Sequence, residues 1–209
     1  MSLTYNQIAG RSAERLAGLS DGVFAFAMTL LVLDLRTPEL EAIHNESDLQ
    51  TALLGLVPNL LTYISSFMIL GILWLGQQAQ LSKLKHSTRD LTWIHLGILF
   101  LVTMVPFSTK LFAAYITYRT ALAVYWLNIL AMGVALSWTW HYVGKANLLK
   151  EDAPPAFYAS VRNRIIFAQS LYAVGVALCV FNTYVSIVFI IVVQLAFIVG
   201  PRTRLLSRL

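Results

Sequence analysis

The chain has 209 residues, of which 58% are hydrophobic and only 12% are charged. Soluble domains carry about 25% charged residues, so the composition excludes an ordinary water-soluble globule. One bilayer span needs ~20 mostly apolar residues, and with short loops this length holds about six spans and no separate catalytic domain. The sequence therefore predicts an all-α, multi-pass integral membrane protein in which residues 1–209 form a single domain.

Six apolar runs mark the expected transmembrane helices. They cover residues 16–35, 52–75, 91–114, 121–143, 165–181 and 184–199. The segments on one side of these spans hold twelve of the basic residues. These are Arg11, Arg15, Lys83, Lys85, Arg89, Lys145, Lys150, Arg162, Arg164, Arg202, Arg204 and Arg208. The opposite side holds only Arg36, Lys110 and Arg119. The positive-inside rule then predicts that both termini are cytoplasmic, as an even number of spans requires.

The basic residues that give the net charge of +5 lie in the segments between the apolar runs. This pattern favours loops that face an anionic leaflet over a nucleic-acid surface. The single cysteine, Cys179, lies in an apolar run, and the four histidines have no companion at ligand spacing. We therefore expect no disulfide framework, no metal site and no bound cofactor.

The first span contains an acidic residue where a carboxylate is costly. Only twelve uncharged residues separate Asp21 from Asp34, and they cover ~18 Å of the ~30 Å hydrocarbon core. Because the apolar run continues below Asp21 as far as Leu16, we expect this carboxylate within the membrane thickness, facing a partner. Trp74, His95 or an asparagine on another helix is the expected partner. The alternative is a helix N-cap at Ser20-Asp21, in which residues 15–19 are not helical.

One face of the first span has a distinct character. Helical spacing places on it Gly22, Phe26, Thr29, Leu30 and Leu33. This face is either a packing stripe between helices or, if several copies surround an axis, a hydrophobic constriction with a ring of threonines. Constrictions of the second kind close pores by dewetting.

The start of the same span resembles a known signature. Arg15-x-x-x-Leu19-Ser20-Asp21 is similar to the R-x-x-x-F-S-D motif that opens the first helix of the lysosomal potassium-channel family (transmembrane protein 175) and its bacterial relatives. The resemblance covers roughly the first 115 residues at motif level. It continues through Ser65-Ser66-Phe67, Trp74, Asp90 and Pro106-Phe107-Ser108-Thr109.

The resemblance implies a potassium-permeable cation channel that assembles as a homotetramer around a pore lined by the first helix, without a re-entrant filter loop. The implied pore-lining and gate residues are Phe26, Leu30 and Leu33, and Thr29 is the implied selectivity residue. The implied structural network at the inner end consists of Arg15, Ser20, Asp21, Trp74 and His95.

Several positions depart from the family pattern. Leu19 replaces the usual phenylalanine, and Phe26 stands where a branched aliphatic residue is common, so the constriction need not have the same shape. Gln77-Gln78 and His95 stand where relatives often carry His-His and Asn, so the inner network need not have the same partners.

We therefore expect a plasma-membrane channel that conducts K⁺ passively, with the bilayer, monovalent cations and other copies of itself as partners, and no nucleic acid. No Ser/His/Asp or paired-carboxylate arrangement predicts an enzyme. A secondary transporter and a non-conducting membrane scaffold are the alternatives. A transporter should have broken helices at matched positions of its two halves. Pro58 and Pro106, however, both fall in the first half, the first three of the six expected spans.

Overall fold

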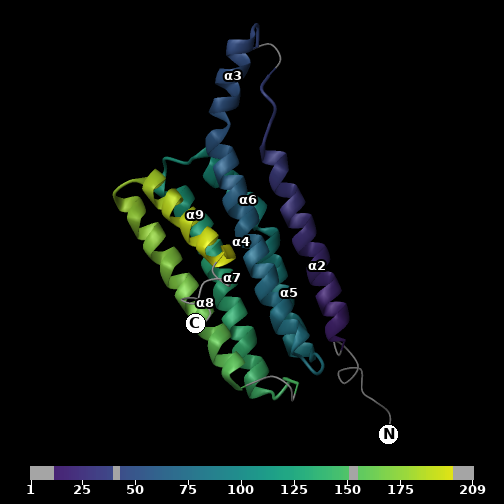
Figure 1. The fold of residues 1–209 in the computed structure, drawn as a ribbon. Helices are drawn as coiled ribbons and strands as arrows, with labels where there is room; N and C mark the ends of the chain where they lie inside the picture. The colour runs from purple at the N-terminus through teal and green to yellow at the C-terminus, as the bar shows by residue number, and fades with distance from the viewer. Residues whose placement is uncertain (1–11, 40–42, 151–154, 200–209) are drawn as a thin grey trace.

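The computed structural model describes residues 12–39, 43–150 and 155–199 as a bundle of helices (Figure 1). In chain order the helices are α2 (Ala13–Leu30), the 3₁₀ turn η1 (Leu31–Asp34), α3 (Glu46–Gly55), α4 (Val57–Ser82), α5 (Arg89–Thr103), α6 (Val105–Ala114), α7 (Arg119–Lys145), α8 (Pro155–Ala177), the 3₁₀ turn η3 (Leu178–Val180) and α9 (Thr183–Val199). Within these ranges the sole strand-like pairing is an isolated β-bridge between Leu84 and Leu149. The all-α prediction is confirmed for the part of the chain that the structure describes.

Five of the helical stretches are long and apolar enough to cross a membrane. They are Ala13–Asp34, Val57–Ser82, Arg89–Ala114, Arg119–Lys145 and Val161–Val180. These match the first five expected spans, although the second continues seven residues past Leu75, to Ser82. The expected sixth span is the shorter apolar helix Thr183–Ile198, which covers ~24 Å of a ~30 Å core. A multi-pass membrane protein is therefore confirmed, with five full-length spans and one short apolar helix among the described residues.

The first span begins earlier than the N-cap alternative requires. Ser12 caps α2, with its hydroxyl accepting a hydrogen bond from the Arg15 amide at 3.2 Å. The helix then continues without a break to Leu30. Residues 15–19 are helical, so a cap at Ser20-Asp21 is the wrong reading. Asp21 instead lies in the middle of α2, two turns above its first residue.

Prolines divide two of the spans into consecutive helices. Pro58 lies in the first turn of α4, directly after the break at Leu56 that ends α3. Pro106 lies in the first turn of α6, after the break at Met104 that ends α5. The first turn tolerates proline because the missing N–H has no partner there.

The middle of the bundle is apolar but is joined by buried hydroxyl and amide groups. Gln194 on α9 donates to the Ser65 hydroxyl on α4 at 2.9 Å, and Thr109 on α6 donates to the Ser66 hydroxyl at 2.8 Å. Ser66 also lies 3.0 Å from the Tyr125 hydroxyl on α7. Because lipid tails are as apolar as the helix surfaces, the hydrophobic effect does not drive membrane helices together, and such hydrogen bonds and close packing hold them instead.

At one end of the bundle two long-range contacts join the spans. Lys110 on α6 forms an ion pair with Asp34 of η1 at 3.8 Å. Arg119, the first residue of α7, donates to the backbone carbonyl of Val180 at 2.9 Å. These contacts tie the end of the first span to α6 and the start of α7 to η3.

At the other end, which we call the basic end because it carries Lys83, Lys85, Lys145 and Lys150, two connecting loops are joined to each other. The Lys85 amide donates to the Leu148 carbonyl, and the Lys150 amide donates to the Lys83 carbonyl, both at 2.9 Å. The side chains of Leu84 and Leu148 are buried beneath this pairing. The α4–α5 loop and residues 146–150 after α7 therefore form one packed unit.

Asn147 ends α7 in a left-handed conformation, with φ at 51°. The Leu148 amide bonds the Val143 carbonyl, and the Asn147 amide bonds the Gly144 carbonyl, which is the Schellman arrangement of a helix C-terminus. The apolar contact that accompanies this motif is made by Val143 and Leu148, which belong to one buried cluster.

We expect Asn147→Val to lower the free energy of unfolding by about 1–2 kcal/mol, because a β-branched side chain is strained in the left-handed region. Asn147→Gly should be neutral or stabilising. Unfolding in mixed micelles, followed by circular dichroism, measures both. Ala146→Val is the matched control, since Ala146 has φ of −85°. An equal loss in the control and in Asn147→Val would contradict the role of the backbone conformation.

Candidate functional site

The first helix presents two different faces. Its buried side consists of Leu16, Ser20, Phe24, Ala27 and Leu31, and it packs against α4, α5 and α6. The other side is open in the single chain, with Phe26 65% and Leu33 68% exposed. Thr29 is also exposed on this side. The structure thus places Phe26, Thr29 and Leu33, three of the four predicted pore-facing residues, away from the bundle.

Leu30 lies at the edge of this face, because it is half-buried rather than exposed. Immediately after it, the chain tightens into η1. A 3₁₀ turn has 3.0 residues per turn instead of 3.6, which rotates the following side chains relative to an α-helix. As a result Val32 is 47% exposed beside Leu33. The α-helical spacing used in the sequence analysis missed Val32.

Thr29 has a defined hydroxyl orientation. Its Oγ1 donates to the Phe26 carbonyl at 2.8 Å. Because the hydroxyl hydrogen is used within the helix, the oxygen lone pairs are left to accept from water or to coordinate a cation. Thr29 is therefore a polar acceptor between the apolar side chains of Phe26 and Leu33.

The carboxylate of Asp21 is held by two neutral donors on α4. Trp74 Nε1–H donates to Asp21 Oδ1 at 2.8 Å, and the Gln78 amide donates to the same oxygen. The sequence analysis expected Trp74 as one of three candidate partners, and the hydrogen bond shows this partner. Trp74 and Gln78 stand four residues apart, so both donors project from one face of α4 toward α2.

A second, buried chain of hydrogen bonds runs beside the first. The Ser20 hydroxyl donates to Gln77 Oε1 at 2.6 Å. Gln77 Nε2 lies 3.0 Å from Nε2 of His95 on α5. All three side chains are buried. His95 therefore contacts Gln77 rather than Asp21, and the chain links α2, α4 and α5.

The structure brings together four of the five residues expected in the inner network, with two glutamines between them. Ser20 reaches His95 through Gln77, and Asp21 meets Trp74 beside Gln78. Arg15 is exposed in the first turn of α2, and no contact within the described ranges joins its guanidinium to this network. The sequence feature that could have placed the two glutamines in this network is their spacing of three and four residues from Trp74.

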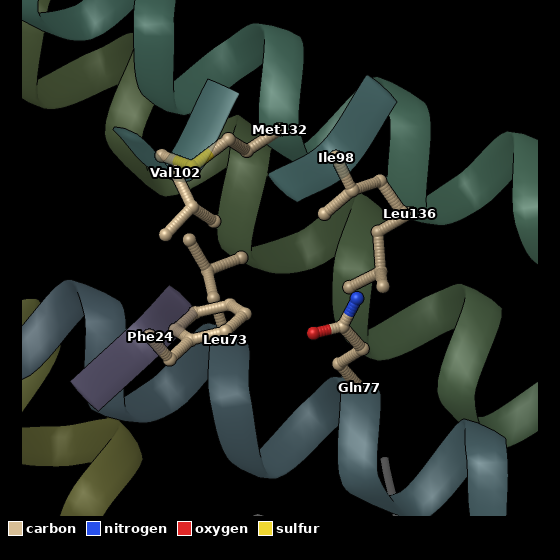
Figure 2. A pocket seen from close by; sticks show the side chains of 7 residues that line it. All are labelled: Phe24, Leu73, Gln77, Ile98, Val102, Met132 and Leu136. Carbon is tan, nitrogen blue, oxygen red and sulfur yellow. The ribbon is translucent and has the colours of Figure 1, made fainter. Parts of the chain in front are cut away.

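The side chains behind α2 pack with almost no free space. A void of about 10 Å³ lies between α2, α4, α5 and α7, and Figure 2 shows the side chains that line it. Its lining residues are Phe24, Leu73, Gln77, Ile98, Val102, Met132 and Leu136. Only Gln77 offers polar atoms, whereas a buried water needs two to four polar partners, so the void is a small packing defect. The buried side of α2 is thus fixed by close packing as well as by hydrogen bonds.

Comparison with known proteins identifies the group of sequences to which this arrangement is similar. The family model described as "Endosomal/lysosomal potassium channel TMEM175" matches residues 15–106. That range begins at Arg15 of the signature and ends at the proline of α6. It includes every residue of the two hydrogen-bonded networks and the whole exposed face of α2.

Relatives extend the similarity over most of the chain. A potassium channel of Chamaesiphon minutus is 30% identical over 83% of this chain and 87% of its own length. A potassium channel of Streptomyces collinus is 32% identical over 71% of this chain and 74% of its own length. The crystal structure of a lysosomal potassium-selective channel TMEM175 homolog from Chamaesiphon minutus superposes with a TM-score of 0.79 at 26% identity, covering 91% of this chain and 98% of that one.

We expect Trp74→Phe to lower the free energy of unfolding by about 1–3 kcal/mol, since it removes a donor from a carboxylate that lies within the span. Trp93→Phe is the matched control, because Trp93 is a 64% exposed tryptophan on α5. Denaturant titration in mixed micelles compares the two variants with the parent. Equal stability of Trp74→Phe and the parent would show that Gln78 alone is sufficient for Asp21.

Proposed function

Since the chain belongs to the TMEM175 family of endosomal/lysosomal potassium channels, we propose that it is a potassium-permeable cation channel, and not an enzyme. In this proposal residues 1–209 form one channel domain with α9 as its sixth span. The permeant ion is K⁺, and no cofactor takes part. The channel lies in the plasma membrane, with the basic end and both termini in the cytoplasm, as the distribution of basic residues favours.

The observation that carries the proposal is the exposed face of α2. A helix that buries Ser20 and Phe24 while leaving Phe26 and Leu33 two-thirds exposed has an apolar face without a partner among the described residues. Four copies arranged around an axis would supply that partner, with the α2 helices at the centre. A homotetramer with a pore lined by α2 is therefore the assembly that we propose.

The proposed mechanism is passive diffusion through a narrow apolar constriction. Phe26, Leu30 and Leu33 narrow the pore, and a closed apolar ring stops ions because water leaves it. The Thr29 oxygens, and waters that they hold, replace part of the hydration shell of K⁺ between the apolar rings. No re-entrant filter loop is used in this mechanism.

A planar bilayer that holds the purified protein, with KCl on one side and NaCl on the other, tests the proposal. A current that reverses toward the K⁺ equilibrium potential is the expected result. A current that reverses at zero would keep the pore and contradict the selectivity. Absence of current in the parent and in the widened variant below would favour a non-conducting scaffold, and current coupled to a second solute would favour a transporter.

We expect Phe26→Ala to raise the K⁺ current several-fold, because it removes the largest side chain from the proposed constriction. Phe100→Ala is the matched control, since Phe100 on α5 is 64% exposed, almost the same as Phe26. Leu30→Ala should raise the current less, because Leu30 is half-buried at the edge of the face. An unchanged current in Phe26→Ala would remove this residue from the gate.

We expect Thr29→Ala to reduce the preference for K⁺ over Na⁺, so that the reversal potential moves toward zero. Thr29→Ser keeps the hydroxyl that donates to the Phe26 carbonyl and should keep the parent's reversal potential. The three proteins are measured in the same KCl and NaCl gradient. Identical reversal potentials in all three would show that the hydroxyl does not select the ion.

A further inference from the structure

A groove on the other side of the subunit from the exposed α2 face has no role in the proposed pore. It has a volume of about 400 Å³ and lies between α4, α7 and α8, with the end of α9 at its edge. Cavities that bind small molecules range over about 300–1,000 Å³. The groove is therefore large enough to hold part of an organic ligand.

The groove lies near the described end of α9. α9 packs against both α4 and α8, but it ends at Val199, whereas α8 begins as early as Pro155 and α7 continues to Lys145. In Figure 1, α9 stops while α7 and α8 continue toward the basic end. The groove lies between α4, α7 and α8, with Phe197 of α9 among its lining residues.

The walls of the groove are mainly apolar. Side chains of Ile69 and Ile72 on α4, Leu136 on α7 and Ile165 on α8 line it. Gly76 and Gly133 also line it, and Gly133 has no room for a Cβ because the Gln169 side chain lies against it. Such a surface fits a hydrocarbon chain better than a polar solute.

One cation stands at the rim of these apolar walls. Arg164 lines the groove and is exposed, with its guanidinium carbon 5.8 Å from the centre of the Phe197 ring. No carboxylate among the described residues pairs with it. Five residues deeper along α8, Gln169 lines the groove too, and its Oε1 is buried without a partner in the described part of the chain.

An apolar groove with a single cation at its rim matches the chemistry of an anionic amphiphile. Basic pockets between helices at the cytoplasmic side of membrane proteins bind anionic headgroups, and the cytoplasmic leaflet is rich in them. The chain's own C-terminal segment fits less well, because Arg202, Arg204 and Arg208 would be repelled by Arg164.

We propose that the groove binds one anionic phospholipid of the inner leaflet per chain, with the phosphate on Arg164 and an acyl chain along the apolar walls. The guanidinium suits a phosphate because its donors form parallel hydrogen bonds to two oxygens. This site is independent of the pore assignment, since it lies on other helices.

Native mass spectrometry of the intact assembly, titrated with phosphatidylglycerol or phosphatidylcholine, tests the proposal. The parent should retain one phosphatidylglycerol per chain and bind phosphatidylcholine more weakly. Arg164→Gln should weaken phosphatidylglycerol binding about tenfold, the loss of one charge-assisted contact, and should abolish the discrimination between the two lipids. Arg164→Lys should keep most of the phosphatidylglycerol binding.

Two matched variants locate the lipid. Arg162→Gln removes an exposed arginine from the same helix, one that does not line the groove, and should leave binding unchanged. Ala79→Phe fills the groove from an exposed position on α4 and should weaken the binding of both lipids.

Three results would overturn the proposal: equal effects of the two arginine substitutions, unchanged binding in Ala79→Phe, or an assembly that retains no lipid because a neighbouring chain covers the groove. The spectra also give the number of chains per assembly. Because lipid binding is read from mass, a failure of the site and a failure of ion conduction are separate outcomes.

Discussion

The position of α2 depends on how a carboxylate is held in the middle of an apolar helix that is long enough to cross a membrane. Asp21 has no cation beside it among the described residues, and its partners are the N–H groups of Trp74 and Gln78 on α4. Breaking these bonds would leave the Asp21 carboxylate without its two donors on α4. The rotation of α2 about its own axis is therefore fixed, and with it the side on which Phe26, Thr29 and Leu33 stand. The buried hydrogen bonds from Ser20 through Gln77 to His95 also fix the rotation of α2.

Much of this arrangement could be predicted from the sequence, because the length and low polarity of an apolar run identify a membrane helix. The first five apolar runs correspond to the five long helices, and the position of Asp21 inside one of them required a partner on another helix, which is Trp74. Helical spacing alone places Phe26, Thr29 and Leu33 on one face of α2, but it leaves open whether that face packs against another helix or lines a pore.

Other features needed the three-dimensional structure. Gln77 and Gln78 were left outside the second span because amides lower its hydropathy, although in space they meet Ser20 and Asp21. The sequence analysis considered an N-cap only at Ser20-Asp21, whereas Ser12 is the serine that accepts from the helix. The turn η1 is too short for its different periodicity to be visible in the sequence, so the sequence analysis did not identify Val32 as an exposed residue. The groove is lined by residues of α4, α7, α8 and α9 together, which no single segment specifies.

The shortness of α9 has a consequence for the surrounding lipid. Its apolar stretch Thr183–Ile198 spans ~24 Å, about 6 Å less than a typical hydrocarbon core, while its neighbours α7 and α8 are long enough to match. Bilayers respond to such a mismatch by thinning locally, at a modest cost per ångström. Around each chain the membrane is therefore expected to be uneven, thinnest beside α9. Thin bilayers accommodate this edge of the protein at lower cost than thick, sterol-rich ones, so bilayer thickness acts on the protein in addition to lipid charge.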